Sequence, residues 1–480
     1  MDEKSIFAVV DLETTAPFKE GGHIIEIGIS YIHNWKIIHN FHSMVNPGVK
    51  IPDSIVNLTG ITDHDVVDAP YFEEIGPLIR RQLFDTVFIA HNVRYDYPYL
   101  NGEFSRIKMP RLRSQYIDTV QLAQVLFPTF KSYKLDKLVK ALNIKLVKHH
   151  RADQDAIATA KLFLLFRKKI CDYSPLTIHN LRKYSKKMIG NTENFFYLAK
   201  GKGKVLNSFK GLDISFLNED KKKYFEKIKT VNKHFQQSHL SNLKIPKLRK
   251  RQFEFADKFS SKVDTNPFIS IFIRPRFGKT NGYLLIAKKL LAFKKILIVQ
   301  ENIRRRVAIS EKILKQFPKL AFYAKVPITR KDFINLDHFR SNLKSNDSPG
   351  QQIAKLRVLS WLSKTTTGYL PEISNGFPES LYDLFSGYRK YKYDLFSQLL
   401  KKYHFPRLGI VDLRSFLLTT KELSNYYDLI IFDVGKRKNK LLGIYKDISS
   451  SVILITQVKS KLKKGYSDKA FKDPKKFFST

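Results

Sequence analysis

The sequence predicts an α/β protein, because apolar strand-like runs alternate with amphipathic helical segments twice along the chain. In the first stretch the strand-like runs lie at 6–14, 24–33, 37–46 and 86–92. A helical pattern follows at 135–144, and a stronger one covers 152–168. We therefore place a first α/β domain at residues 1–170.

A second α/β pattern begins near residue 247 with a helical segment and the apolar run FISIFI. Further strand-like runs lie at 296–300, 408–412, 427–433 and 451–457. We place a second α/β domain at residues 246–460, with a helical insertion at about 301–405. The lysine-rich stretches at 171–245 and 461–480 are predicted to be a basic connector and a basic tail.

The charge of the chain is strongly positive and unevenly distributed. Lysine and arginine number 85 against 44 acidic residues, which gives a formal net charge of +41. Residues 1–170 hold 22 basic and 19 acidic residues, whereas 171–480 hold 63 and 25. A polyanionic partner such as nucleic acid is the first interpretation. A basic surface that only promotes solubility is the alternative.

Several classes of protein are excluded by composition. The single cysteine, Cys171, cannot form an internal disulfide or supply the ligands of a four-cysteine iron–sulfur cluster. No apolar run reaches the ~18–20 residues that a membrane helix needs. The acidic first residues do not resemble a secretory signal peptide. We expect a cytoplasmic protein with no membrane partner, and the sequence does not identify a protein partner or an oligomeric state.

Four carboxylates and one histidine form the chemically most specific pattern. Asp11 and Glu13 lie two apart on a predicted strand, so both face one side. Asp96 follows the strand-like run 86–92, while His150 and Asp155 flank the start of the helix at 152–168. Carboxylates from three segments suit two Mg²⁺ or Mn²⁺ ions, and a histidine can accept a proton from water.

Each of these pieces is common as a strand end, a turn or a helix cap, but their order and context carry a resemblance. DLETT (11–15), AHNVRYDYPYL (90–100), YIDTVQLAQVLFP (116–128) and HHRADQDAIATA (149–160) resemble the DnaQ-like DEDDh exonucleases. The resemblance implies a ribonuclease H-like fold, 3′→5′ polarity and two divalent ions.

The same resemblance assigns roles to individual residues. Asp11, Glu13, Asp96 and Asp155 would be the metal ligands and His150 the general base, with His149 only its neighbour. We further expect substrate contacts from four residues beside these motifs, namely Thr14, Thr15, His91 and Asn92.

A possible phosphate-binding loop lies in the second domain. Gly278, Lys279 and Thr280 follow a predicted strand and open a predicted helix. Ile273 stands where the first glycine of such a loop is usual, and residues 274–277 are Arg-Pro-Arg-Phe. Since proline removes a backbone donor, the sequence leaves ATP binding open.

Wider context resembles DinG-type superfamily 2 helicases. RKRQFEFADKF (249–259) resembles their glutamine-bearing motif, and YDLIIFDVGK (427–436) stands where they carry DEAH. Only Asp433 matches that motif, because Val434 replaces the glutamate and Lys436 the histidine. We find no second RecA-like lobe, so we expect a degenerate lobe that neither hydrolyses ATP nor unwinds duplexes.

The leading hypothesis is a metal-dependent 3′→5′ exonuclease that releases 5′-mononucleotides from single-stranded nucleic acid, with DNA preferred over RNA. The alternatives are an ATP-driven DinG-type helicase or translocase with an attached nuclease, a 3′→5′ exoribonuclease, and a non-catalytic nucleic-acid-binding factor.

Overall fold

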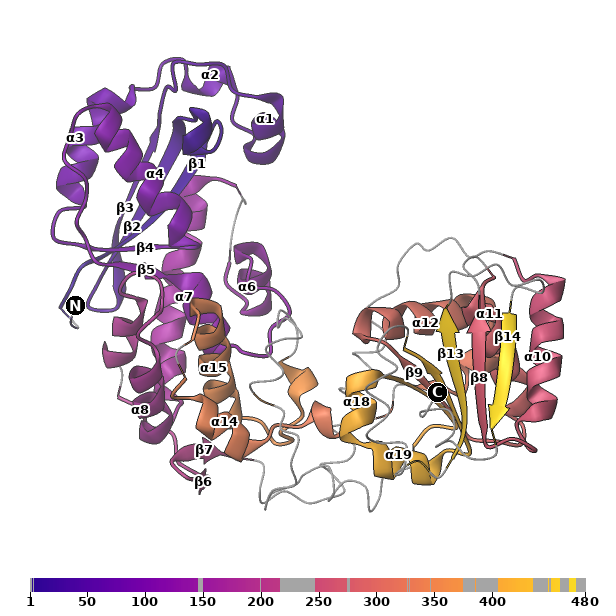
Figure 1. The fold of residues 1–480 in the computed structure, drawn as a ribbon. Coiled ribbons are helices and arrows are strands. Elements are labelled where there is room, and N and C mark those ends of the chain that lie inside the picture. Colours follow the sequence, from indigo (N-terminus) through magenta and orange to yellow (C-terminus); the bar gives the residue numbers. More distant parts are fainter. Residues whose placement is uncertain are drawn as a thin grey trace. The chain divides into compact units, whose positions relative to one another are not determined.

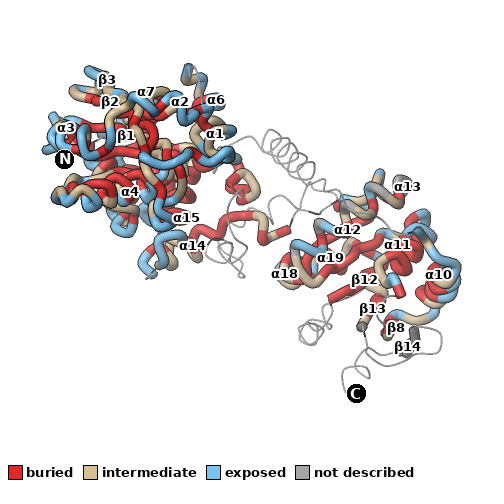
Figure 2. Tube along the Cα trace, turned by 90° about the horizontal axis from the view of Figure 1, so that it is seen from above, coloured by how far each residue is buried: buried red, intermediate tan, exposed pale blue. Residues whose placement is uncertain are grey.

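The computed structural model divides the chain into two units, each with a sheet of its own (Figure 1). The first unit comprises Met1–Asp220, Phe339–Gly368 and Glu372–Leu384, and the second comprises Lys221–His338, Tyr369–Pro371 and Phe385–Thr480. The structure describes residues 2, 4–145, 150–198, 200–215, 247–273, 277–325, 327, 329–345, 347–373, 385, 405–434, 448, 450–457 and 466–471. Figure 2 shows that buried residues are concentrated in the interior of each unit.

The first unit is built on a five-stranded mixed sheet with the order β3-β2-β1-β4-β5. β1 (Phe7–Thr14) pairs antiparallel with β2 (Ile24–His33), which pairs antiparallel with β3 (Lys36–Met44). On its other side β1 pairs parallel with β4 (Val87–Ala90), followed by β5 (Tyr116–Asp118). Together with the helices below, this sheet confirms the α/β class predicted from the sequence.

Helices pack around this sheet and place the candidate residues at its edge. The 20-residue helix α7 (Ala152–Cys171) contacts β1, β2 and β3 through buried alanine, leucine and phenylalanine side chains. The other helical elements are η1 (Phe18–Glu20), α1 (Asp53–Thr59), α2 (Asp63–Val66), α3 (Phe72–Gln82), α4 (Val93–Arg106), α5 (Thr119–Leu126), α6 (Leu135–Ala141), α8 (Pro175–Tyr184) and η2 (Thr192–Leu198).

The segment predicted as a basic connector, 171–245, is ordered secondary structure in its first part. It contains α8, η2 and a hairpin of β6 (Asn207–Phe209) and β7 (Leu212–Ile214). Its residues 216–245 lie outside the described part of the chain.

Part of the predicted helical insertion belongs to the first unit. α14 (Leu336–Asn342) leads into α15 (Pro349–Leu362), and α15 packs against α5, α8 and β7. Nearly every residue of α15 from Ile353 onward is buried, including Trp361. A helix that is buried on all sides requires contacts on all sides, and the first unit supplies part of them.

The second unit is a seven-stranded sheet with the order β10-β11-β9-β12-β13-β8-β14. All pairs are parallel except β14 with β8, and the central parallel strands are mostly apolar and buried, as is usual when both faces are covered. The strands are β8 (Phe268–Ile273), β9 (Ile296–Gln300), β10 (Ala324–Lys325), β11 (Leu408–Asp412), β12 (Leu429–Asp433), β13 (Ser451–Gln457) and β14 (Tyr466–Phe471).

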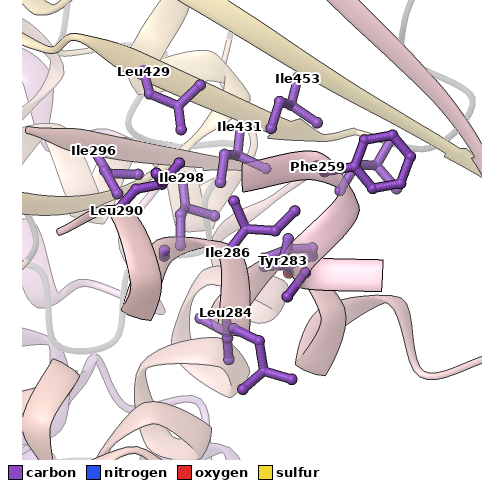
Figure 3. Packing of buried hydrophobic residues seen from close by; sticks show 14 of the residues in the cluster. Phe259, Tyr283, Leu284, Ile286, Leu290, Ile296, Ile298, Leu429, Ile431 and Ile453 are labelled. Carbon is purple, nitrogen blue, oxygen red and sulfur yellow. The ribbon is translucent and has the colours of Figure 1, made fainter. Parts of the chain in front are cut away.

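The core of the second unit lies between this sheet and its helices. Figure 3 shows Ile298, Ile431 and Ile453 of three neighbouring strands facing Tyr283 and Ile286 of α11. The helical elements are α10 (Lys250–Lys262), α11 (Lys279–Leu290), α12 (Ile303–Gln316), α13 (Pro318–Ala321), η4 (Arg330–Asp332), η5 (Leu370–Glu372), α18 (Leu413–Leu418) and α19 (Thr420–Tyr426).

The segment 461–480, expected from the sequence to be a basic tail, contains the edge strand β14. Asp468 of this strand forms ion pairs of 2.8 Å with Lys258 and 2.7 Å with Lys262 on α10. One acidic residue in a lysine-rich segment thus gives the strand a charge-complementary position beside that helix. Within the described residues, no helix is both long and apolar enough to span a bilayer.

Candidate active site

The first two carboxylates lie on one face near the end of β1. Asp11 and Glu13 are partly exposed, whereas Leu12 between them is buried. In the antiparallel register Asp11 lies opposite Gly28 and Glu13 opposite Glu26 of β2. The period of two along a strand therefore directs both carboxylates to the same side, as the sequence predicts.

The entry to α7 brings the next two residues to that face. A Cβ on Gly28 would lie 2.2 Å from the Ala152 carbonyl oxygen, so only glycine allows β2 to approach the start of α7 this closely. His150 has a positive φ of 58°, and its backbone N–H donates to Asp155 Oδ2 at 3.2 Å. This turn places His150 on the loop and Asp155 in the first turn of the helix.

The structure brings Glu13, His150 and Asp155 together, with one ligand atom from each within 4.8 Å of the others. The three side chains come from β1, the loop before α7 and α7 itself. Asp155 is buried and His150 is exposed, so the cluster opens to solvent on the histidine side. His149 lies outside the described residues.

Asp96 reaches the same region from the first turn of α4. The side chain is only 4% exposed, and its carboxylate accepts a hydrogen bond from the backbone of Leu12. Asn92 precedes the helix in the left-handed conformation, with φ 77°. The N–H of Val93 donates to Asp118 Oδ2 at 2.9 Å, which fixes the start of α4 against β5.

Burial and neighbouring carboxylates together raise the pKa values of the acidic residues at this site. Burial raises the pKa of Asp11 well above its usual range, and the neighbouring carboxylates of Asp96 and Asp155 raise it further. Burial likewise raises the pKa of Glu13 to about 7 and that of Asp96 to about 8. Hard divalent cations prefer such oxygen ligands, so the donor set fits Mg²⁺ or Mn²⁺.

A network behind the site was not predicted from the sequence. Glu26 is fully buried and accepts hydrogen bonds from Arg151 Nε at 2.9 Å and from the Ala152 N–H at 3.0 Å. His42 Nε2 lies 2.7 Å from the same carboxylate. Burial alone would raise the pKa of Glu26, but the hydrogen bonds from His42 and Arg151 hold it below its usual value.

This network anchors the backbone that directly follows the candidate base. Arg151 and Ala152 directly follow His150, so Glu26 fixes the chain where it enters α7. The only sequence signal was a glutamate within the apolar strand IIEIGIS, where an unsatisfied charge would be costly.

The residues expected to contact substrate differ in their exposure and in their hydrogen-bond partners. Thr14 shares a 2.6 Å hydrogen bond with the hydroxyl of Tyr95, and Thr15 Oγ1 accepts from the His23 N–H at 2.9 Å. Both threonines are buried, whereas Asn92 is exposed.

His91 is engaged inside the domain. Its Nε2 donates to the Tyr133 carbonyl, and its Nδ1 lies 2.9 Å from the Thr119 hydroxyl. Burial lowers the pKa of His91 to about 4, so the ring is neutral at neutral pH. These contacts describe a residue that holds neighbouring segments in place.

A basic cavity adjoins the acidic cluster. It has a volume of about 640 Å³, and its wall includes His150 and Asp155 on one side and α6 on the other. Lys134, Lys137 and Lys140 line the α6 side at a spacing of three residues. Residues three apart share a helix face, so these cations are placed beside the carboxylates.

The described residues of the predicted phosphate loop in the second unit make contacts within the protein. Gly278 caps α11 with φ 86°, and Lys279 Nζ lies 2.5 Å from Asp433 Oδ1. Gln252 Nε2 donates to the carbonyls of Phe277 and Gly278 at 3.1 and 3.3 Å. Thr280 lies in the first turn of α11.

A hydrogen-bonded chain continues from the acid of this pair. The hydroxyl of Tyr283 donates to Asp433 Oδ2 and accepts from Gln300, both at 3.2 Å. Val434, where a glutamate would be needed to activate water, is fully buried. Residues 274–276 and Lys436 lie outside the described part of the chain.

Comparison with known proteins identifies the first domain. Residues 8–163 match the protein-family model RNase_T, described as Exonuclease. This match confirms the exonuclease domain that the sequence motifs resemble.

Among curated proteins, the chain is 28% identical over 386 residues to the 3′-5′ exonuclease DinG of Staphylococcus aureus strain USA300. The alignment covers 77% of this chain and 42% of that protein, so the chain spans about two fifths of the length of the curated relatives it matches.

Solved structures resemble about a third of the chain. Exonuclease X in complex with 5′ overhanging duplex DNA is 25% identical, with a TM-score of 0.28, and the match covers 34% of this chain and 91% of that one. The nuclease domain of 3′hExo, a DEDDh family member bound to rAMP, is 17% identical, with a TM-score of 0.32 and coverages of 35% and 94%.

Proposed function

We propose, from the exonuclease-family domain at residues 8–163, that this chain is a metal-dependent 3′→5′ exonuclease. It would act on single-stranded nucleic acid, with DNA preferred over RNA, and release 5′-mononucleotides. The observation that carries the proposal is the convergence of Glu13, His150 and Asp155 beside Asp11 and Asp96.

The carboxylates are the candidate ligands of two divalent cations. Burial, together with neighbouring carboxylates, raises the pKa values of Asp11, Glu13 and Asp96, and these three residues and Asp155 offer the oxygen atoms that two cations require. Bound cations would neutralise this charge, polarise the scissile phosphate and activate water for attack.

The protein side chains supply the remaining chemistry. His150 is exposed at the open side of the cluster, where its imidazole accepts the proton of the attacking water. Lys134, Lys137 and Lys140 bind the phosphates that follow the reacting one, because they line the adjoining cavity. We further propose that Asn92, which is exposed before α4, and the hydrogen-bonded Thr14–Tyr95 pair contact the terminal nucleotide.

For the second unit we propose nucleic-acid binding without ATP-driven unwinding. Lys279 is engaged with Asp433, and Val434 is buried in the core. The strong positive charge of residues 171–480 suits the phosphate backbone of the substrate. A helicase or translocase, the alternative weighed above, would require ATP turnover that Lys279→Ala abolishes.

The test is digestion of 3′- and 5′-labelled DNA and RNA oligonucleotides with and without Mn²⁺, EDTA and ATP. We expect stepwise shortening from the 3′ end that needs the metal, is indifferent to ATP and is blocked by a 3′-phosphate. Shortening of 5′-blocked RNA but not DNA would favour the exoribonuclease. Binding without cleavage in Mn²⁺ would overturn the proposal in favour of the non-catalytic binding factor.

A further inference from the structure

Helix α15 reaches the exonuclease domain from far along the chain. It lies in sequence between β10 and β11 of the second unit, yet it belongs to the first unit and packs against α5 and α8. Ser360 Oγ donates to the hydroxyl of Tyr173 at 2.5 Å within this contact. The helix is therefore a structural part of the exonuclease unit.

One cation of α15 is directed at the loop formed by residues 127–134, which joins α5 to α6. Arg357 is only 3% exposed, and its Nη2 donates to the Pro128 carbonyl at 3.0 Å. Its guanidinium also lies over the ring of Tyr133, 5.4 Å from the centroid. A buried guanidinium has to satisfy its donors, and here the 127–134 loop supplies both a carbonyl and an aromatic face.

The same loop is tied to the candidate active site. The carbonyl of Tyr133 accepts the hydrogen bond from His91 Nε2 at 2.9 Å, just before Asn92 and α4. The loop then leads through Lys134 directly into α6, and residues of both line the wall of the same cavity as His150 and Asp155, namely Lys134, Leu135, Asp136, Lys137, Val139 and Lys140. The position of that wall depends on how the 127–134 loop is held.

We propose that Arg357 is a positioning residue of the exonuclease site, through which the inserted helix α15 aligns the lysine-bearing wall of α6. This inference rests on the proposed function for its kinetic consequence, but its structural consequence is independent of catalysis. Arginine suits the role because its planar guanidinium can stack on a ring face and carries several donors in a fixed geometry, whereas lysine has a single ammonium on a flexible chain.

The experiment uses the full chain with Arg357→Lys, Arg357→Ala and the matched control Lys364→Ala. Lys364 follows α15 and donates to the Asp172 carbonyl at 2.7 Å, and its ammonium lies over the ring of Tyr173, so it is a cation of the same segment that contacts this unit at other residues. Hydrogen exchange of residues 127–141 is measured first, followed by KM and kcat on a single-stranded oligonucleotide.

Both Arg357 variants should exchange faster in residues 127–141, and their KM should rise about 3- to 30-fold while kcat changes less. Lys364→Ala should leave both quantities near those of the unaltered chain. Arg357→Lys keeps a buried cation, so it tests the loop contact even if Arg357→Ala does not fold.

Unchanged exchange in Arg357→Lys, or equal effects of Arg357→Lys and Lys364→Ala, would overturn the proposal. If the unaltered chain shows no nuclease activity, the proposed function fails while the exchange measurement still decides the role of Arg357.

Discussion

The two units each place a buried or half-buried aspartate near the end of a core strand, and the neighbours of the two aspartates differ in sign. Burial raises the pKa of Asp11 on β1, and the neighbouring carboxylates raise it further. Asp433 of β12 meets the ammonium of Lys279 at 2.5 Å and the hydroxyl of Tyr283. A site of like charges requires added cations, whereas a site of opposite charges is already compensated. The comparison supports the proposals of ion-dependent chemistry in the first unit and of a structural role for Lys279 and Asp433 in the second.

The largest expected effect is on the acidic site. Asp11→Asn should lower the rate of 3′-end digestion by more than about 100-fold, because even partners behind metal ligands typically cost 10–100-fold. Single-turnover assays with a 5′-labelled oligonucleotide measure it. Asp85→Asn is the matched control. Asp85 is exposed and comes before the amino end of β4, whereas Asp11 lies near the carboxyl end of the parallel strand β1. Equal digestion rates for Asp11→Asn and Asp85→Asn would contradict the proposal that the acidic site of the first unit carries the ion-dependent chemistry.

The compensated pair should matter for stability. Lys279→Met leaves Asp433, which is 3% exposed, without its cation and should cost about 3–5 kcal/mol of unfolding free energy for the second unit. Lys279→Met with Asp433→Leu should recover much of that loss. Urea unfolding of both variants checks this, with 3′-end digestion unchanged in the folded proteins. A double variant no more stable than the single one would contradict the structural role.

Glu26 allows the same comparison within the first unit. Its carboxylate is paired with Arg151 and His42, whereas the carboxylates of the neighbouring acidic site face one another. Glu26→Gln should lower kcat about 10-fold with little change in KM, since it loosens Arg151 next to the candidate base. Steady-state kinetics separate the two quantities. Glu20→Gln, an exposed glutamate on η1, is the control. A rise in KM alone would assign Glu26 to substrate binding instead.

The smallest expected effect is a pH dependence of stability without metal. Glu13 and Asp96 have folded-state pKa values of about 7 and about 8, so the folded protein keeps protons that the unfolded chain releases near pH 4. Stability in EDTA should therefore fall as pH rises from about 4 to about 8. Mn²⁺ should restore a few degrees of Tm at pH 8.

Thermal unfolding across this pH range tests it against Glu13→Gln/Asp96→Asn, whose stability should fall less steeply with pH. Identical slopes for the two proteins would show that these carboxylates do not carry the effect.

The sequence predicted those parts of the structure that depend on local periodicity. Asp11 and Glu13 face one side because a strand alternates, and the pattern at 152–168 gave α7 almost to its ends. The pairing of Glu26 with Arg151 spans 125 residues, and no local pattern encodes such a contact.

Long-range packing also explains the other differences. The apolar residues of α15 indicate that the helix packs against other elements, but they do not indicate which ones. Its place in the first unit was therefore not predicted. β14 is held by antiparallel pairing with β8 and by the ion pairs of Asp468 with two lysines of α10, and these contacts are likewise distant in sequence.

The placement of α15 has a consequence for the order of events during synthesis. Residues up to Ile214 leave the ribosome first, and α15 follows only after the intervening part of the second unit. At about 5–20 residues per second, a gap of roughly 150 residues delays its arrival by about 10–30 s. Through that interval all four candidate metal-binding carboxylates have been synthesised, but the helix that we propose to align the lysine-bearing wall has not.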